Sequence, residues 1–304
     1  MCYFRSHLYY RSVPIYWSAI KLDLETCIRK SELKGKSAVI CGGSKGIGKE
    51  TAKLFTKLGS NLCIIARDRE ELGKVQTECN VLKISSDQMI DVISCDCTNF
   101  NVLKRLLDDY VRDHGTPDFL LNVVGYAYPQ YVEKLTLENC VNNYHVNYNG
   151  QLIPTLILLP YFMEAKRGHI VFVSSLLGFL GIMGYVAYSP SKFALVGLAE
   201  CLRNELRPYN IKISILCPPD TDTPGFAEEN KLKPKECALI SEHAKLLHPE
   251  TVSKAFVKGI LQQKFMIFPG HVKLFWLAKR FLPQLIYRIL DNDLIKARKK
   301  LGKN

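Results

Sequence analysis

A short apolar run followed by closely spaced glycines restricts the fold of this chain more than any other feature. The run SAVICG ends at Gly42, and the next segment reads GSKGIGKETAKLFTKLG. Gly42 permits a tight turn from strand to helix, Gly46 lets the backbone approach a phosphate, and Gly48 lets the helix pack closely against the sheet. Unpaired N–H groups at the start of such a helix point at the phosphate. The segment predicts a dinucleotide site with contacts from Gly42, Ser44, Lys45, Gly46, Ile47 and Gly48.

Apolar runs and helical segments alternate along the chain. Strands are expected at residues 37–42, 61–66, 91–95, 119–124, 169–175, 211–217 and 265–268, and helices at 46–59, 68–82, 100–113, 137–165 and 188–206. Strands that are apolar throughout and separated by helices indicate a parallel sheet with both faces covered. The sequence predicts a single doubly wound, Rossmann-type α/β domain over 37–268, an N-terminal extension over 1–36 and a C-terminal tail over 269–304.

The end of the second predicted strand indicates which dinucleotide is bound. A site for NAD usually has an acidic residue there, which bonds the ribose hydroxyls. This chain has Arg67 in that place and Lys45 in the glycine turn. Two cations suit a 2′-phosphate, so the sequence favours NADP(H) over NAD(H). The ends of the third and fourth strands are expected to supply further cofactor contacts, from Asp96, Cys97, Asn122 and Gly125.

A second group of residues has the composition of an acid–base site. Tyr188 and Lys192 stand four residues apart at the start of a predicted helix and therefore share one face. A neighbouring ammonium lowers the pKa of a phenol and brings it toward working range. Ser175, at the end of a strand, can hydrogen-bond a substrate carbonyl, and Asn147 can anchor a water that links Lys192 to solvent.

With these motifs in register, the chain resembles the short-chain dehydrogenase/reductase family from about residue 37 to 225. The resemblance implies that Tyr188 protonates the developing alkoxide, Lys192 lowers its pKa and holds the nicotinamide ribose, and Ser175 polarises the carbonyl. Asn147 would complete a proton relay. Three positions depart from the family pattern without removing a catalytic atom: Cys41, Val124 and Pro219.

Residues 217–230 read CPPDTDTPGFAEEN, and their prolines predict a stiff loop. The resemblance places this loop over the nicotinamide, with contacts from Pro218, Thr221 and Thr223, and makes 219–250 a substrate lid. The string is similar to a branch of the family that reduces a long-chain sphingoid ketone, 3-oxosphinganine, to sphinganine with NADPH. The resemblance therefore implies a membrane-borne substrate and a place in sphingolipid biosynthesis.

Two other functions remain open at this point. One is the oxidation or reduction of another lipid, steroid or retinoid by the same chemistry, because the catalytic groups do not select the carbon chain. The other is a catalytically idle NADP(H)-binding scaffold, against which the intact set of Ser175, Tyr188 and Lys192 argues.

The charge of the chain lies at its ends. The net charge is +12, of which residues 251–304 contribute +10. In residues 272–290 the apolar positions form one helical stripe: Leu274, Ala278, Phe281, Leu285 and Ile289. A basic amphipathic helix of this kind suits a membrane surface, and the alternative is a helix pair packed on the body or on a second subunit. The branch resemblance implies the cytosolic face of the endoplasmic reticulum membrane.

Other partners are restricted by the same patterns. Nucleic acid is a poor explanation for the charge because the basic residues alternate with bulky aliphatics and no recognition motif is present. Eleven cysteines without a C-x-x-C pair indicate free thiols and no metal site. No apolar stretch in residues 1–36 has the length of a membrane span. The family resemblance implies a homo-oligomer formed through the helices near 137–165 and 188–206.

Overall fold

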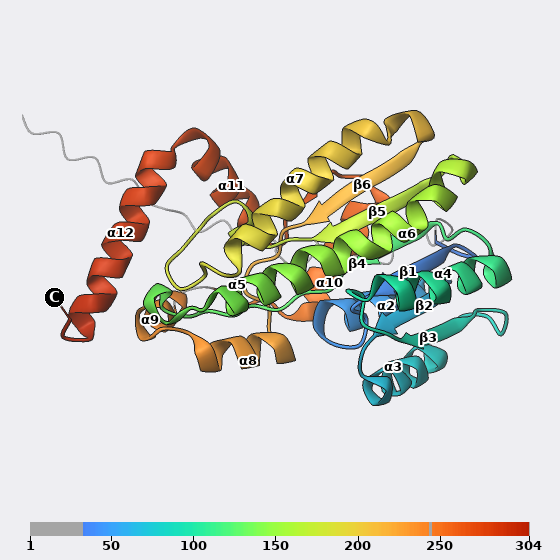
Figure 1. Ribbon diagram of the computed structural model, residues 1–304, viewed down its shortest axis with the longest axis horizontal. Helices are drawn as coiled ribbons and strands as arrows, with labels where there is room; N and C mark the ends of the chain where they lie inside the picture. The colour runs from blue at the N-terminus through green and yellow to red at the C-terminus, as the bar shows by residue number, and fades with distance from the viewer. Residues whose placement is uncertain (1–32, 243–244, 304) are drawn as a thin grey trace, which may run out of the picture.

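The computed structural model describes residues 33–242 and 245–303, so the predicted N-terminal extension lies almost entirely outside the described residues. Within them, the strands form one seven-stranded sheet in the order β3-β2-β1-β4-β5-β6-β7 (Figure 1). Every neighbouring pair in it is parallel. The predicted doubly wound parallel sheet is therefore confirmed.

The elements have the following bounds. The strands are β1 (Ser37–Cys41), β2 (Asn61–Ala66), β3 (Ile90–Ser94), β4 (Phe119–Asn122), β5 (Gly168–Val173), β6 (Ile211–Leu216) and β7 (Met266–Ile267). The helices are α2 (Gly46–Lys57), α3 (Arg69–Val81), α4 (Phe100–His114), α5 (Leu137–Tyr144), α6 (Gly150–Ala165), α7 (Ser189–Glu205), α8 (Pro224–Leu232), α9 (Lys235–Ser241), α10 (Pro249–Leu261), α11 (Val272–Phe281) and α12 (Pro283–Lys300).

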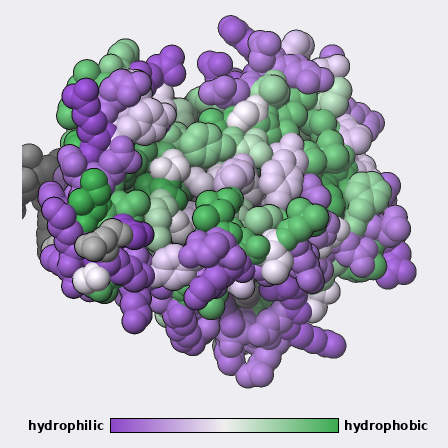
Figure 2. All heavy atoms as spheres, turned by 60° about the vertical axis from the view of Figure 1, so that its left-hand side comes forward, coloured by the Kyte–Doolittle hydropathy of each residue, from purple (hydrophilic) through white to green (hydrophobic). Residues whose placement is uncertain are grey.

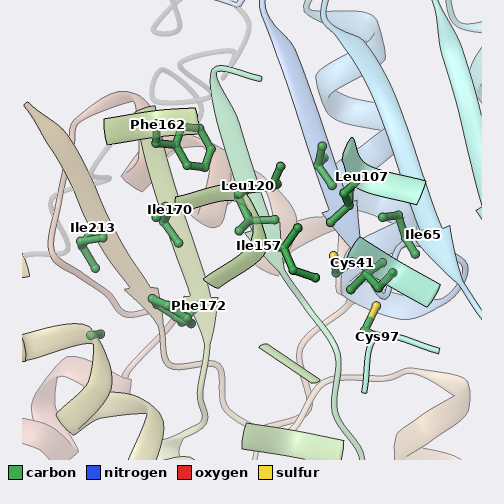
Figure 3. Close-up of a cluster of buried hydrophobic side chains, with 14 of the residues drawn as sticks. Cys41, Ile65, Cys97, Leu107, Leu120, Ile157, Phe162, Ile170, Phe172 and Ile213 are labelled. Atoms are coloured by element: carbon green, nitrogen blue, oxygen red, sulfur yellow. The ribbon is translucent and has the colours of Figure 1, made fainter. Parts of the chain in front are cut away.

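Two apolar cores lie on the two faces of the sheet. One is formed with α4, α6 and α7, and Figure 3 shows part of it, where Ile157 and Phe162 of α6 meet Leu120 and Ile170 of the strands. The other is formed with α2, α3 and α10. Because side chains of successive strand residues point to opposite faces, strands that are apolar throughout supply both cores.

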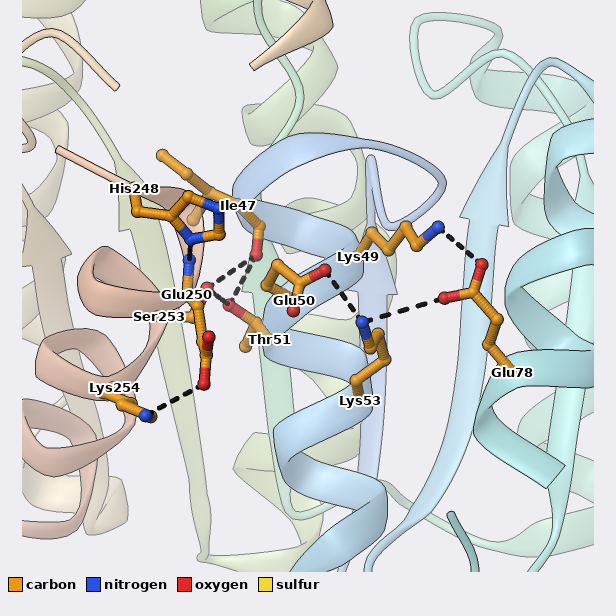
Figure 4. A network of polar contacts seen from close by, with 10 residues as sticks. All are labelled: Ile47, Lys49, Glu50, Thr51, Lys53, Glu78, His248, Glu250, Ser253 and Lys254. Atoms are coloured by element: carbon orange, nitrogen blue, oxygen red, sulfur yellow. Dashed lines mark hydrogen bonds and ion pairs between the residues drawn. The ribbon is translucent and has the colours of Figure 1, made fainter. Parts of the chain in front are cut away.

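The helix that carries the glycine turn is fixed by polar contacts as well as by apolar packing. The Thr51 hydroxyl donates to the Ile47 carbonyl at 2.7 Å and to Ser253 of α10 at 3.2 Å (Figure 4). Lys53 pairs with Glu50 at 3.0 Å and lies 3.7 Å from Glu78 of α3. These contacts hold the start of α2 between its two neighbours.

The long helix predicted over 137–165 is interrupted. A π-helical segment (His145–Asn149) separates α5 from α6 and contains Asn147. The wider turn of a π-helix changes the direction of the side chains that follow, so the side chains of α6 are rotated relative to those of α5. Such segments are frequent at functional sites. Apolar periodicity over the whole stretch does not reveal this single wider turn.

The loop predicted over 217–230 ends earlier than expected. From Pro224 onward the chain is the helix α8, and α9 follows it in the lid. Proline at the first helical position is tolerated because the N–H it lacks would have no partner there. Thr223 caps the helix by accepting a hydrogen bond from the Phe226 N–H at 3.1 Å. Pro224 therefore stands at the start of a helix, whereas the prolines of this stretch predicted that no helix forms here.

The C-terminal tail is two helices instead of one. The chain breaks between α11 and α12 at Leu282, which precedes Pro283. Much of the predicted stripe remains uncovered, with Phe281 70% and Leu274 64% exposed. Figure 2 shows apolar side chains among charged ones on the side of the molecule that carries these helices. No helix among the described residues has the length and apolar character of a bilayer span.

The end of the tail is attached to the lid. Lys303 donates to Glu236 of α9 at 2.8 Å, and the Tyr131 hydroxyl donates to the other oxygen of the same carboxylate at 2.7 Å. Burial alone would raise the pKa of Glu236, but the bonds from Lys303 and Tyr131 lower it to about 2. The helix α12 also packs against α9.

Gly48→Ala tests the close approach of α2 to β1. A Cβ at this position would lie 2.2 Å from the Gly42 carbonyl oxygen, a backbone atom that cannot rotate away. We expect the substitution to lower the free energy of unfolding by about 2 kcal/mol, in the range of overpacked cores, measured by urea denaturation.

The matched control is Gly73→Ala, which lies in α3 with no atom within 4 Å of the added Cβ. Alanine is the better helix former, so this variant should gain up to about 1 kcal/mol. Equal effects of the two substitutions would contradict the packing explanation.

Candidate active site

A cavity of about 730 Å³ opens at the carboxyl ends of the parallel strands, between the glycine turn and the lid. This edge of an open parallel sheet is where ligands of doubly wound proteins bind. The cavity is lined by most of the predicted site residues: Gly42, Ser44, Lys45, Gly46, Ile47, Gly48, Arg67, Asp96, Cys97, Gly125, Ser175, Tyr188, Lys192, Pro218, Thr221 and Thr223.

The glycine turn has the shape of a phosphate cradle. Gly42 and Gly46 have positive φ angles of 83° and 54°, and a Cβ on Gly46 would lie 2.9 Å from Thr223 across the cavity. The N-cap residue Lys45 places no side-chain acceptor on the first N–H groups of α2. Residues 46–48, which carry these N–H groups, line the cavity, and the start of a helix without a side-chain cap fits the phosphates of a dinucleotide.

Cys41, which departs from the family pattern, is buried beneath this turn. A hydrogen bond with Cys97, a residue after the third strand, is the largest contribution to the raised pKa of the Cys41 thiol.

The far end of the cavity carries two cations and two carboxylates. Arg67 is exposed and lines the cavity, while Lys45 Nζ lies 4.0 Å from the Asp68 carboxylate. Asp68 is already used as the N-cap of α3, where it accepts from two backbone N–H groups at 3.1 Å. Asp96 accepts from the Thr98 N–H and hydroxyl, both at 2.8 Å. The guanidinium of Arg67 is left to interact with a ligand.

Tyr188, Lys192 and Ser175 come together at the opposite end. The Lys192 ammonium is buried, donates to the Val173 carbonyl at 3.0 Å and lies 5.6 Å from the centre of the Tyr188 ring. Burial lowers the pKa of Lys192 to about 7. Burial also raises the pKa of Tyr188 above its ordinary value, Glu229 raises it further, and a hydrogen bond with Ser175 acts in the opposite direction.

Two predicted site residues do not line the cavity. Asn122 is fully buried and donates to Thr155 at 3.0 Å, so its side chain belongs to the packing of β4 against α6. Asn147 accepts from the Tyr126 N–H at 2.8 Å and donates to the Ser191 hydroxyl at 3.0 Å. Its amide is occupied by protein groups, so it positions the backbone beside Lys192.

Thr221 and Thr223, which were expected to contact the cofactor, make hydrogen bonds within the protein. Thr223 caps α8, and the Thr221 hydroxyl donates to the Pro219 carbonyl at 2.8 Å. Both residues still border the cavity. Short polar side chains near prolines commonly bond their own backbone, and this local alternative was available in the sequence.

Sequence reasoning missed an acidic group in the substrate end of the cavity. Glu229 of α8 and Asp220 of the preceding loop both line it, and burial raises the pKa of each. Glu229 accepts from the Tyr185 hydroxyl at 2.5 Å and lies 3.4 Å from Lys233. The string AEEN did not indicate that one glutamate enters the cavity. Glu228 and Glu229 are adjacent in the sequence, and they differ only in the side of α8 on which they lie, a helix that the sequence did not predict.

Lys192→Met tests the charge state of the buried lysine. Because burial lowers the pKa of Lys192 from its ordinary value of 10.5 to about 7, folding releases a proton between these pH values. The burial cost is therefore full below pH 7 and declines as pH rises toward 10.5. We expect the ligand-free variant to exceed the parent in unfolding free energy by on the order of 2 kcal/mol at pH 7, with the difference vanishing toward pH 10.5.

Urea denaturation across this pH range measures the difference. The Val173 carbonyl keeps a second donor, Gln151, at 2.9 Å, so the variant leaves no acceptor unpaired there. A stability difference that does not change with pH would contradict a buried titrating ammonium.

Known proteins resemble this chain in sequence and in structure. A 3-dehydrosphinganine reductase of Danio rerio is 40% identical over 77% of this chain and 71% of its own. The human 17-beta-hydroxysteroid dehydrogenase 13 is 30% identical over 86% of this chain and 84% of its own. The crystal structure of LigD from Sphingobium sp. strain SYK-6 superposes with a TM-score of 0.69 at 26% identity, over 86% of this chain and 98% of that one.

The family described as short chain dehydrogenase matches residues 36–234. That span contains the glycine turn, Ser175, Tyr188 and Lys192, which the fold brings to one cavity. The chain belongs to the short-chain dehydrogenase family and is an oxidoreductase.

Proposed function

We propose that this protein reduces 3-oxosphinganine to sphinganine with NADPH. The observation that carries the proposal is the meeting of Tyr188, Lys192 and Ser175 in one cavity with the glycine turn. The substrate comes from the relative named 3-dehydrosphinganine reductase, at 40% identity, against 30% for the hydroxysteroid dehydrogenase. The second relative makes a steroid substrate the alternative.

The reduction requires a hydride and a proton. A nicotinamide cofactor held at the glycine turn, at Gly42, Gly46 and Gly48, would supply the hydride. Tyr188 donates its phenolic proton to the carbonyl oxygen, while the Ser175 hydroxyl, bonded to the tyrosine, orients that oxygen. The Lys192 ammonium, 5.6 Å from the centre of the Tyr188 ring, would stabilise the phenolate left behind.

The first experiment follows NADPH absorbance with 3-oxosphinganine in detergent micelles and identifies the product by mass. Turnover that disappears in Tyr188→Phe, while NADPH affinity persists, supports both mechanism and substrate. NADPH binding without turnover of this ketone, but with turnover of a steroid ketone, moves the assignment to the alternative. Full activity in Tyr188→Phe would contradict the proton-donor role.

We also propose NADPH rather than NADH, on the basis of Arg67. Its exposed guanidinium borders the cavity beyond β2, and Asp68 is engaged in capping α3. A guanidinium binds a phosphate with charge-assisted hydrogen bonds.

Arg67→Asp should raise the KM for NADPH by about 10- to 100-fold, the effect of losing such bonds, and should change the KM for NADH far less. Steady-state kinetics with both cofactors measure this. Arg69→Asp is the matched control, since Arg69 is two residues further on and does not line the cavity. An unchanged cofactor preference in Arg67→Asp would mean that the 2′-phosphate is bound elsewhere.

We propose, third, that α11 and α12 attach the protein to the cytosolic face of the endoplasmic reticulum membrane. Exposed apolar side chains on these helices lie among basic residues: Leu274, Phe275, Phe281, Leu282, Leu285, Tyr287, Ile289 and Ile295. Residues 251–304 carry a net charge of +10, which attracts anionic lipid. A substrate with a long hydrocarbon chain would be met at that surface.

The double variant Phe281→Ser/Leu285→Ser should reduce flotation with phosphatidylserine-containing vesicles by about tenfold, because two apolar anchors are lost. The control is Val81→Ser/Ile84→Ser, which removes two exposed apolar side chains near the end of α3. Equal flotation of parent and tail variant would contradict attachment through this surface.

A homo-oligomer remains part of the proposal. Exposed apolar side chains also lie on α5, α6 and α7, the helices expected to form the contact: Leu137, Val141, Leu156 and Phe193. Light scattering of the purified protein measures the mass, and a monomer at all concentrations would contradict it.

A further inference from the structure

Glu229 occupies the catalytic cavity without a part in the proton transfer described above. It projects from α8 in the lid, its side chain is 15% exposed, and it lines the same cavity as Tyr188. Asp220 lines this end of the cavity too. Carboxylates are rarely placed in a largely buried site without a partner for their charge.

The protein supplies too few cationic and hydrogen-bonding partners for the carboxylates of Glu229 and Asp220. Tyr185 and Lys233 both bind Oε1 of Glu229, at 2.5 Å and 3.4 Å. Among residues 33–242 and 245–303, no hydrogen bond or ion pair is seen at Oε2 of Glu229 or at the Asp220 carboxylate. Two carboxyl groups thus share one buried ammonium, that of Lys233, and the lid side of the cavity has one carboxyl group more than it has cationic partners.

Unpaired carboxylate charge at this place opposes the proposed chemistry when the substrate brings no cation of its own. The charges of Glu229 and Asp220 both disfavour ionisation of Tyr188. A phenol beside uncompensated carboxylates is a poorer proton donor, because the phenolate it leaves would be repelled. A positive charge brought in with the substrate would neutralise the carboxylates and remove the repulsion.

We propose that Glu229, assisted by Asp220, binds the protonated amine of an α-amino ketone and thereby selects for it. The inference rests on the proposed function, since 3-oxosphinganine carries an ammonium on the carbon next to its carbonyl. When that carbonyl bonds Tyr188 and Ser175, the ammonium lies within the same end of the cavity. Glu229 is a specificity residue in this arrangement, and the acid–base group remains Tyr188.

The test compares 3-oxosphinganine with 1-hydroxyoctadecan-3-one, which has the same chain, ketone and hydroxyl but no amine. Glu229→Gln should raise the KM for 3-oxosphinganine by roughly 10- to 100-fold, the loss of one charge-assisted hydrogen bond. The KM for the amine-free ketone and the KM for NADPH should each change less than about threefold. Asp220→Asn should act in the same direction with a smaller effect.

Glu228→Gln is the matched control. Glu228 is the neighbouring residue on α8, is 70% exposed and pairs with Lys231 away from the cavity. This variant should behave as the parent with both ketones. Retained NADPH affinity in Glu229→Gln shows that the variant is folded.

An unchanged KM for 3-oxosphinganine in Glu229→Gln, with the parent active, overturns amine recognition and leaves the proposed function standing. If the parent reduces neither ketone, the proposed function has failed. A binding measurement then tests the inference. Tryptophan fluorescence of the NADP⁺ complex is titrated with sphinganine and with octadecane-1,3-diol, and the two affinities are compared. Tighter binding of sphinganine than of octadecane-1,3-diol by the parent, lost in Glu229→Gln, supports amine recognition. Equal affinities of the parent for the two ligands overturn it.

Discussion

The buried ammonium of Lys192 is the group around which the site is built. It donates to the carbonyl of Val173 at the end of β5, and a Cβ on Gly125, beyond the end of β4, would lie 2.8 Å from it. The Lys192 carbonyl accepts from the Ser174 hydroxyl at 2.8 Å. One residue of α7 thereby makes two hydrogen bonds to the end of β5 and lies close beside the end of β4. Burying a charge is costly without such partners, so these contacts are required to keep it in place.

The position of Lys192 also accounts for two neighbouring features, the side-chain bonds of Asn147 and the glycine at position 125. Asn147 binds the backbone of Tyr126, next to Gly125, and the π-helical segment turns its amide toward that strand end. Glycine is required at position 125 because the lysine and Asn147 leave no room for a side chain. Asn147 is identified as a positioning residue by its hydrogen bonds to other protein groups.

The lid adds a second electrostatic layer. Asp220 and Glu229 place negative charge beside Tyr188, the proposed proton donor, while Lys233 offsets only part of it. The lid is in turn joined to the tail through the bonds of Glu236 with Lys303 and Tyr131. A tail that rests on a membrane would therefore be connected, through α9, to the elements that cover the substrate.

The sequence by itself determined the sheet and the glycine turn, and it predicted the residues of the proposed acid–base group. These are short-range patterns: apolar runs of strand length, glycines at fixed spacing, and Tyr188 four residues before Lys192. The tertiary structure alone decided which side chains face the cavity. Asn122 turned inward to Thr155, and Glu229 entered the site through a helix that begins at a proline. Such choices depend on contacts between segments distant in the chain, whose geometry no local pattern encodes.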